Sequence, residues 1–466
     1  MLVISFYSHF SQIVKFDAYK NITMHKQTLE QLKSGELKGT TKIKLSCGLK
    51  EFPAELFQLV DTLELLDLSG NQLSMLPADL KLFKKLKIAF FSDNLFTELP
   101  AILGQCVSLQ MIGFKANKIS HISENAIPIH TRWLILTDNC IAQLPDSIGN
   151  CAKLQKVMLA GNKLTTLPKA MSNCKNIELL RISANNILQL PLWIFTLPRL
   201  SWLAHAANPC SNATLTNNNL NTFSWNDIAL KEELGNGASG VIYKADINKK
   251  NVAVKIFKGE VTSDGLPQSE MLACEAAGNH PNITTVLGEI KNHPENKQGL
   301  VLELIADEFK NLGNPPSFET CTRDTFDSTT VFTTAELMQI ISGIASALNH
   351  LHNNGIMHGD VYAHNILIDK KANPLLGDFG AATQYDNNSV TAESLQKIEV
   401  RTFGYLLEDI LTRTNYEPKD EILIAELNQL LLNCTHSDVL SRPTFKTIVH
   451  QLSSLSIKSP TKVAHK

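Results

Sequence analysis

Seven asparagines recur through the first half of the chain at an almost constant interval. The spacings between successive members are 23, 23, 22, 23, 23 and 23 residues. A run of alternating apolar residues precedes each of them, as in "LDLSGNQLSMLP" at 66–77. A self-similar period of roughly 20 to 50 residues indicates stacked structural units rather than one globular core. The seven positions are Asn71, Asn94, Asn117, Asn139, Asn162, Asn185 and Asn208.

The repeated unit resembles the leucine-rich repeat, in which a short strand leads into a turn. The asparagine or cysteine of that turn bonds backbone groups of adjacent coils, and Cys47 holds the same slot 24 residues before Asn71. One unit cannot bury its leucines alone, whereas stacked units share a continuous core. The resemblance therefore predicts an α/β leucine-rich-repeat solenoid over residues 28–210, with a concave face that binds a protein substrate or regulator.

Three cysteines fall on the same period. Cys106, Cys151 and Cys174 each lie 12 residues after a repeat asparagine, so we interpret them as stacked copies of one small buried position. The chain has nine cysteines without paired metal-ligand spacing. That usage favours a reducing compartment, and we expect the cytoplasm.

Composition and polarity define the remaining segments. Charged residues make up 19% of the 466 residues and the formal net charge is −2, so no nucleic-acid partner or anionic membrane surface is expected. No stretch approaches 18 uninterrupted apolar residues, so no membrane span is expected. The segments predicted around the repeats are an N-terminal extension without the basic start of a signal peptide (1–27), a polar linker (211–224), a second domain (225–456) and a tail (457–466).

A glycine-rich motif opens the second domain. The stretch "LGNGASG" at 234–240 contains Gly235, Gly237 and Gly240 in G-x-G-x-x-G spacing, and the apolar Ile242 follows. Glycines allow a backbone to approach phosphates closely, and the flanking strands would form a hairpin over them. By itself, this spacing fits an ordinary glycine-rich hairpin equally well.

A lysine and a glutamate follow on predicted regular elements. Lys255 lies in the β-rich run "VAVKIF", from which it would project toward phosphates. Glu270 lies ten residues before His280, on a segment suited to a helix that presents a carboxylate to this lysine. Glu275 on the same segment is the competing candidate.

The next two elements lead to the centre of the domain. The run "LVLELIADEF" predicts a strand in which Leu302 would flank the nucleotide site and Glu303 would begin a hinge. The run "TTAELMQIISGIASALNHLH" predicts an amphipathic helix opened by a capping box between Thr333 and Glu336.

Polar residues then follow in two short loops. Asp360 and Asn365 lie in "MHGDVYAHNILID" at 357–369, and Asp378 lies in "LLGDFGAA", thirteen residues after Asn365. Six features now stand in order along the chain, and their order and spacing resemble those of protein kinases. They are the glycine-rich motif, Lys255, Glu270, Asp360, Asn365 and Asp378. The whole chain thus resembles a leucine-rich-repeat protein kinase, and the resemblance implies a bilobal α+β protein-kinase-like domain after the solenoid.

The resemblance also implies a role for each matching residue. Lys255, held by Glu270, would bind phosphate oxygens of ATP, and Asp360 would orient the acceptor hydroxyl and accept its proton. Asn365 and Asp378 would hold Mg²⁺. The other nucleotide-binding positions would cover the phosphates or contact adenine, and they are Gly235, Gly237, Gly240, Ile242, Ala253, Glu303, Ile305 and Leu367.

Three features depart from the kinase pattern. Gly359 stands where many kinases carry an arginine that pairs with a phosphorylated activation loop, and Tyr362 stands where Ser/Thr kinases carry a lysine. The segment that follows is short and lacks Ala-Pro-Glu, with Glu399 in the place of the aspartate that usually opens the next helix. Arg442 therefore lacks its usual glutamate partner, for which Glu393 or Glu399 would substitute.

We therefore predict an ATP- and Mg²⁺-dependent protein kinase, directed at Ser or Thr, whose repeats recruit partners or substrate in signal transduction. Tyr362 and His364 leave the choice between Ser/Thr and Tyr open, because neither family's usual residue is present. The alternative is a pseudokinase scaffold that binds nucleotide and protein partners without turnover. A GTPase-coupled kinase is not expected, because no G-x-x-x-x-G-K-[ST] loop occurs.

Overall fold

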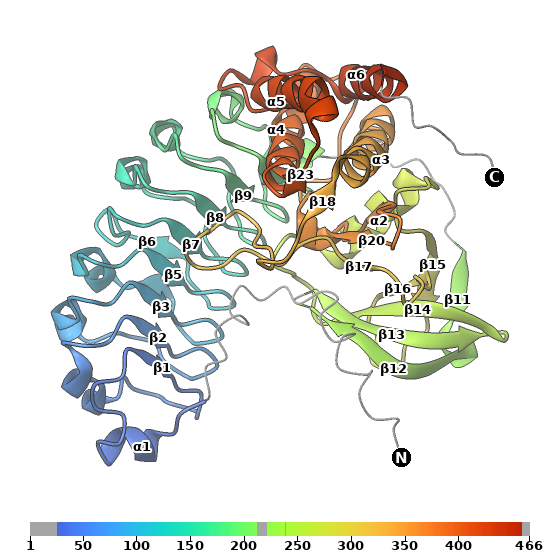
Figure 1. Cartoon of the computed structure of the whole chain (residues 1–466). Helices are drawn as coiled ribbons and strands as arrows, with labels where there is room; N and C mark the ends of the chain where they lie inside the picture. Colours follow the sequence, from blue (N-terminus) through green and yellow to red (C-terminus); the bar gives the residue numbers. More distant parts are fainter. Residues whose placement is uncertain (1–25, 212–220, 238, 459–466) are drawn as a thin grey trace.

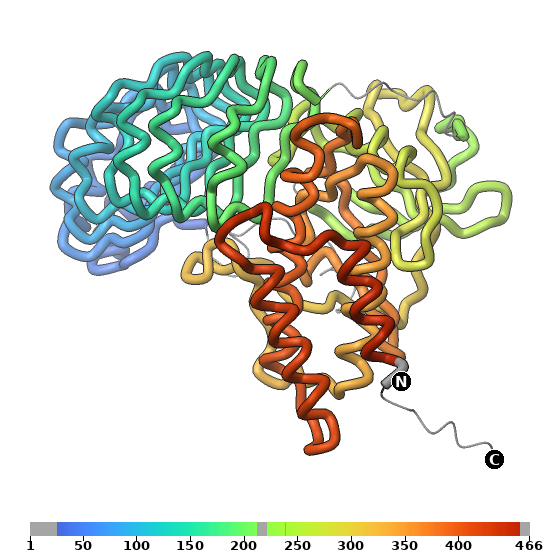
Figure 2. The backbone as a smooth tube through the Cα atoms, turned by 90° about the horizontal axis from the view of Figure 1, so that it is seen from above, coloured from blue at the N-terminus to red at the C-terminus, as the bar shows by residue number. Residues whose placement is uncertain are grey.

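The computed structural model describes residues 26–211, 221–237 and 239–458. Most of the predicted N-terminal extension, linker and tail lies outside these residues. The first half of the chain is a curved stack of coils, and the second half lies against its inner side (Figures 1 and 2). Within the described ranges, no helix has both the length and the apolar character that a membrane crossing requires.

The inner side of the stack is one eight-stranded sheet. Neighbouring strands are parallel and pair in register, one strand from each coil. In sheet order these strands are β1 (Lys42–Lys44), β2 (Leu65–Asp67), β3 (Ile88–Phe90), β5 (Met111–Gly113), β7 (Trp133–Ile135), β8 (Lys156–Met158), β9 (Leu179–Arg181) and β10 (Trp202–Ala204).

The outer side of the stack carries short 3-10 helices, after a first α-helix, α1 (Leu29–Lys33). Six of these turns follow directly on a proline, whose fixed φ suits the entry into a helical turn. They are η2 (Ala54–Leu59), η3 (Ala78–Leu82), η4 (Ala101–Gln105), η5 (Asp146–Asn150), η6 (Lys169–Asn173) and η7 (Leu192–Thr196). A two-stranded sheet of β4 (Glu98–Leu99) and β6 (His121–Ile122) lies between coils.

The repeat asparagines join each coil to the one before it, as their spacing predicts. The Asn94 side-chain nitrogen donates to the carbonyls of Leu68 (3.0 Å) and Phe91 (3.1 Å), and its oxygen accepts from the Leu73 N–H (2.8 Å). Asn71 accepts in the same way from the Cys47 N–H at 3.1 Å. These bonds satisfy buried backbone groups that the short strands leave unpaired.

Alternation along the three-residue strands divides the stack into two faces. The middle residue of each strand points into the leucine core, as Leu134 and Leu180 do. The first and third residues point to the concave face, where Phe90, Met111 and Trp133 form a separate buried cluster with residues of the second half. The middle of the concave face is therefore apolar and is covered by the second half of the chain, which differs from the expectation of a face open to partners.

The second half begins with a six-stranded sheet and one helix, α2 (Pro267–Ala277). The sheet order is β11-β15-β16-β14-β13-β12. The strands are β11 (Thr222–Ser224), β12 (Ile228–Asn236), β13 (Gly240–Ile247), β14 (Lys250–Phe257), β15 (Val286–Lys291) and β16 (Gly299–Glu303).

A helical lobe follows and carries the largest core of the second half. The predicted capping box is confirmed, since Thr333 accepts from the Glu336 N–H and Glu336 accepts from the Thr333 N–H. The helices are α3 (Thr334–Asn353), α4 (Ala392–Leu411), α5 (Glu421–Cys434) and α6 (Phe445–Lys458). The segments between the helices form three small sheets. The first pairs β17 (Lys310–Asn311), β20 (Ile366–Ile368) and β21 (Pro374–Leu376), the second pairs β18 (Phe332–Thr333) with β23 (Thr414–Asn415), and the third pairs β19 (Ile356–Met357) with β22 (Thr383–Gln384).

Candidate active site

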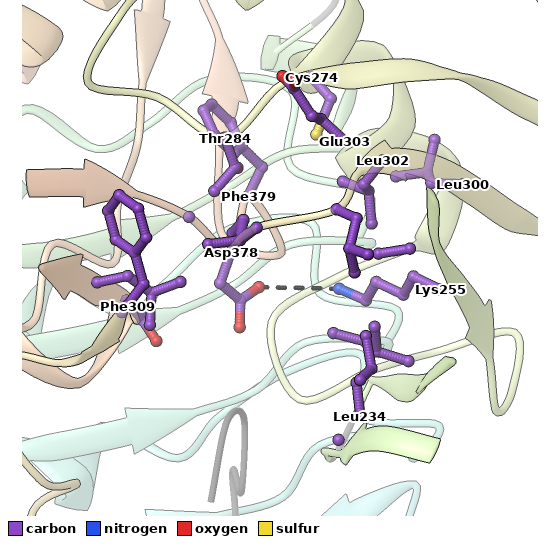
Figure 3. A pocket seen from close by; sticks show the side chains of 18 of the residues that line it. Leu234, Lys255, Cys274, Thr284, Leu300, Leu302, Glu303, Phe309, Asp378 and Phe379 are labelled. Carbon is purple, nitrogen blue, oxygen red and sulfur yellow. Dashed lines mark ion pairs between the residues drawn. The ribbon is translucent and has the colours of Figure 1, made fainter. Parts of the chain in front are cut away.

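A cavity of about 150 Å³ lies between the six-stranded sheet and the helical lobe. Apolar side chains from both parts line it, with a few polar groups at one side, as is usual for a small-molecule site. Figure 3 shows Leu234 and Leu302 among the residues around it. The predicted adenine-site residues all line this cavity, and they are Ile242, Ala253, Glu303, Ile305 and Leu367.

The glycine-rich motif forms the predicted hairpin between β12 and β13. Gly235 lines the cavity, and the Gly237 N–H donates to the Gly240 carbonyl at 2.9 Å. A Cβ atom on Gly240 would lie 2.6 Å from the Ile256 carbonyl oxygen, so this position has no room for a side chain. The hairpin therefore runs close over the next strand at the edge of the cavity.

Three charged side chains meet at the polar side of the cavity. The Lys255 ammonium on β14 lies 2.5 Å from the Glu270 carboxylate on α2 and 3.9 Å from the Asp378 carboxylate. Lys255 and Asp378 point toward each other in Figure 3. Glu270, rather than Glu275, is the glutamate that meets the lysine. Burial alone would lower the pKa of Lys255, but Glu270 and Asp378 raise it, so the lysine stays charged.

Asp360 and Asn365 lie on the loop between β19 and β20. The Asn365 amide nitrogen donates to the Asp360 carboxylate at 2.8 Å and to its backbone carbonyl at 3.0 Å. Asn365 lines the cavity together with Asp378, so its amide oxygen and the Asp378 carboxylate are the hard donors available to a cation there. In the described part of the chain, no three His, Cys, Asp or Glu side chains are grouped as a metal site of their own.

Glu399 on α4 binds the backbone of this loop. Its buried carboxylate accepts from the N–H groups of His358 (3.2 Å) and Gly359 (2.6 Å) and pairs with His352 at 2.8 Å. It lies in the interior of α4 rather than at the start of the helix. Although burial opposes it, these contacts lower the pKa of Glu399, which keeps the carboxylate ionised.

An arginine of the coil stack also reaches the loop. Arg181 on β9 pairs with Asp360, donates to the Gly359 carbonyl at 2.8 Å and pairs with Asp264 at 2.7 Å. Arg181 is 1% exposed and Asp360 is 3% exposed. Burial raises the pKa of Asp360 to about 6, although the guanidinium of Arg181 opposes this shift. No motif or spacing in the sequence marks Arg181 as part of the site.

Tyr362, one of the departures from the kinase pattern, also meets the stack. Its ring stacks on Trp202 of β10 with centroids 4.5 Å apart and an interplanar angle of 3°. The Trp202 indole N–H donates to the Val361 carbonyl at 3.2 Å. The stack therefore contacts this loop both at the residue before Asp360 and at the two residues after it.

The prediction that Glu393 or Glu399 pairs with Arg442 is wrong. Its guanidinium donates to the carbonyls of His436 (2.9 Å), Lys397 (3.0 Å) and Pro198 (3.1 Å) rather than to a carboxylate. Glu393 instead pairs with Lys397 at 2.7 Å. Arg442 thus links the helical lobe to the last coil of the stack.

Comparison with known proteins identifies the second half. Residues 228–423 match the protein kinase domain family. Similar proteins include the probable L-type lectin-domain containing receptor kinase I.5 of Arabidopsis thaliana (29% identical over 38% of this chain and 25% of that protein). Others are the dual specificity protein kinase pyk3 of Dictyostelium discoideum (22%, over 50% and 19%) and the serine/threonine-protein kinase PITSLRE of Drosophila melanogaster (29%, over 32% and 15%).

Residues 228–423 thus form a protein kinase domain, with relatives named as serine/threonine and dual specificity kinases. The chain spans only about 15% to 25% of the length of these three relatives. The cavity, Lys255, Asp360, Asn365 and Asp378 all lie within the matched residues.

Proposed function

We propose that the chain is an ATP-dependent protein kinase that transfers the γ-phosphate of Mg·ATP to a protein hydroxyl, with Ser or Thr as the favoured acceptor. The observation that carries this proposal is the arrangement of Lys255 between Glu270 and Asp378 at the edge of an apolar cavity. We take residues 225–456 as the catalytic domain, 28–210 as a leucine-rich repeat domain and 211–224 as the linker between them.

The cavity fits a nucleotide in both shape and charge. Ile242, Ala253 and Leu367 supply apolar surface for adenine, and the backbone of Glu303 and Ile305 lies beside them. The Gly235–Gly240 hairpin would cover the phosphates, and Lys255 would bind their oxygens. Glu270 holds the lysine in that position.

Asn365 and Asp378 are the residues that would hold Mg²⁺. They offer an amide oxygen and a carboxylate, which are ligands that Mg²⁺ prefers, and phosphate oxygens would complete its shell. Bound there, Mg²⁺ would neutralise charge on the phosphoryl group in transfer. Asp360 would orient the acceptor hydroxyl and accept its proton.

The repeat domain would recruit the substrate or a regulator and so raise its concentration beside the active site. A cytoplasmic location fits this role, since all nine cysteines are free thiols.

A pseudokinase scaffold is the second candidate, and the Asp360 contacts favour it. Each carboxylate oxygen of Asp360 already accepts one hydrogen bond, from Arg181 or from Asn365, and the residue is buried, so an acceptor hydroxyl would have to displace Arg181 to reach it. In that case the chain would bind nucleotide without transfer.

The experiment that separates the two functions is transfer of labelled γ-phosphate by the purified full chain. Wild type is compared with Asp360→Asn, Asp378→Asn and the matched control Asp386→Asn, which changes an exposed aspartate outside the cavity. A kinase gives incorporation into itself or a generic protein that is lost in the first two variants and kept in the third. Silence of all four chains and of Arg181→Gln, which removes the guanidinium from Asp360, with nucleotide-dependent thermal stabilisation of the wild type intact, would support the scaffold.

A further inference from the structure

We propose that the coil stack holds the acceptor side of the active site shut, with Arg181 as the residue that occupies Asp360, while the nucleotide side stays open. This inference rests on the proposed kinase function and adds its regulation. The protein would then rest in a state that binds Mg·ATP but excludes an acceptor hydroxyl.

The first observation is the charge arrangement around Arg181. Its guanidinium lies between the carboxylates of Asp360 and Asp264, and both ion pairs are buried. A buried ion pair is held only where its geometry and extra hydrogen bonds offset desolvation, and here the Gly359 carbonyl supplies a further acceptor. An acceptor hydroxyl would have to displace this arginine to reach Asp360.

The second observation is that two further loops of the kinase domain contact the stack, one on the concave face and one at the turn after β8. In the loop between β17 and β18, the Phe318 ring lies 6.2 Å from Phe90 and 6.3 Å from Trp133, between centroids. In the loop between β14 and α2, Val261 lies against Gly161, where a Cβ atom would meet its side chain at 2.6 Å. Phe318 therefore covers the apolar middle of the face, whereas the Asp360 loop meets its end at β9 and β10.

The third observation is that the nucleotide cavity is not covered in the same way. Its lining residues all come from 234–379, and none comes from the coil stack. The stack therefore obstructs only one of the two substrates. Such selectivity is expected of a regulatory contact and is not expected of a merely collapsed active site.

A further contact between the two halves lies at the end of the stack. Ala392, Leu395 and Ile398 of α4 belong to the same apolar core as Leu197 and Leu200 of the last coil, so α4 seals the open end of the stack. Neither Arg181 nor Phe318 belongs to this core, so the contacts of the Asp360 and Phe318 loops with the concave face can be lost while α4 stays packed. A protein that binds the concave face would compete with these loops and so release Asp360.

The test uses full-length chains that carry Arg181→Gln or Phe318→Ala. Arg181 projects from the concave face, outside the leucine core, and Phe318 packs against Phe90 and Trp133 of other strands of that face. We expect each change to raise the kcat/KM for a protein acceptor by about tenfold, within the usual range of coupling between sites. The affinity for Mg·ATP should stay within about twofold, because the cavity is untouched.

Two matched controls come from the stack itself. Lys44→Gln removes a cation at the same strand position on β1, where it pairs with Asp67 of the stack at 3.0 Å. Phe52→Ala removes a ring that contacts Phe57 and Phe83 within the stack. Both should leave transfer unchanged.

Amide hydrogen exchange over residues 357–365 gives a readout that does not depend on catalysis. Faster exchange together with faster transfer, both absent in the controls, would support the proposal, and Asp360→Asn added to Arg181→Gln should abolish the gain. Faster exchange with transfer at or below the wild-type rate would overturn it, because Arg181 would then position Asp360 in the working enzyme. If no chain transfers phosphate although the loop exchanges faster, the kinase function itself fails and this inference with it. Unchanged exchange and transfer in both variants would also overturn it.

Discussion

A Cβ atom on Gly359 would lie 2.6 Å from the carbonyl oxygen of Leu203. It would also lie 2.8 Å from the carbonyl oxygen of Ala381, and the backbone at Gly359 has φ +73°, which disfavours any side chain. Leu203 belongs to β10 of the coil stack, whereas Gly359 precedes Asp360 in the kinase domain. The departure from the usual arginine thus coincides with a close approach of the two halves.

Replacing this glycine tests how tightly the halves dock. Gly359→Ala should lower the free energy of unfolding by about 2–3 kcal/mol, since it adds backbone strain of about 1–2 kcal/mol to two close contacts. The control is Gly35→Ala, where φ is +80° but nothing lies within 4 Å, so only the strain remains. Denaturant unfolding measures the loss of free energy of unfolding in the two variants. Equal losses in the two variants would contradict the close docking at Gly359.

Glu399 offers a second prediction. Glu399→Ala should destabilise the chain by about 3 kcal/mol and abolish transfer, because it leaves His352 and two loop N–H groups without their buried acceptor. Glu399→Asp keeps the charge on a shorter side chain and should lose less stability and less transfer activity. Unfolding and transfer assays on the two variants check this order. The prediction fails if aspartate and alanine behave alike.

The sequence predicts the stacking and the lysine–glutamate pair because both depend on local spacing. The asparagine period determines which backbone groups meet, and the distance from Lys255 to Glu270 suits a strand and the helix after it. Arg181 could not be placed in this way, because no repeat spacing says which coil meets a loop 178 residues later. A usable signal was present in the apolar residues at the outward strand positions, which an exposed concave face would not favour.

The error over Arg442 has a related cause. A guanidinium needs acceptors, and the sequence analysis considered only carboxylates. Three backbone carbonyls serve instead, and one belongs to Pro198 of the stack. Contacts between segments far apart in the chain are invisible to spacing arguments.

Thiol reactivity separates the stacked cysteines from the exposed one. Burial raises the pKa of Cys151 to about 12 and of Cys106 and Cys174 to about 11, so all three remain thiols at neutral pH. Cys47 is exposed and should react first with a chromogenic disulfide at pH 8. The buried three should react only after unfolding in denaturant. Mass spectrometry of the labelled sites checks the order, and fast labelling of Cys151 in the native chain would contradict the stacked position.

The last prediction concerns the pH dependence of stability. His205 follows β10, is 2% exposed, and its Nδ1 atom has no hydrogen bond among the described residues. Burial lowers the pKa of His205 to about 4, from 6.5 for a free histidine. The folded chain therefore keeps this imidazole neutral at pH values where the unfolded chain protonates it. The free energy of unfolding is therefore unaffected by this histidine above pH 6.5. It falls by up to about 3 kcal/mol as the pH falls toward 4.

His205→Leu should remove most of this loss, because leucine fills a similar volume and cannot take up a proton. The backbone N–H of residue 205 would keep its bond to the Thr383 hydroxyl, now 3.2 Å long. Thermal unfolding between pH 7 and pH 4.5 measures the slope for wild type, for this variant and for the exposed control His121→Leu. We expect a shallower slope for His205→Leu alone. Parallel slopes in all three chains would show that protonation of His205 does not set the pH dependence of stability.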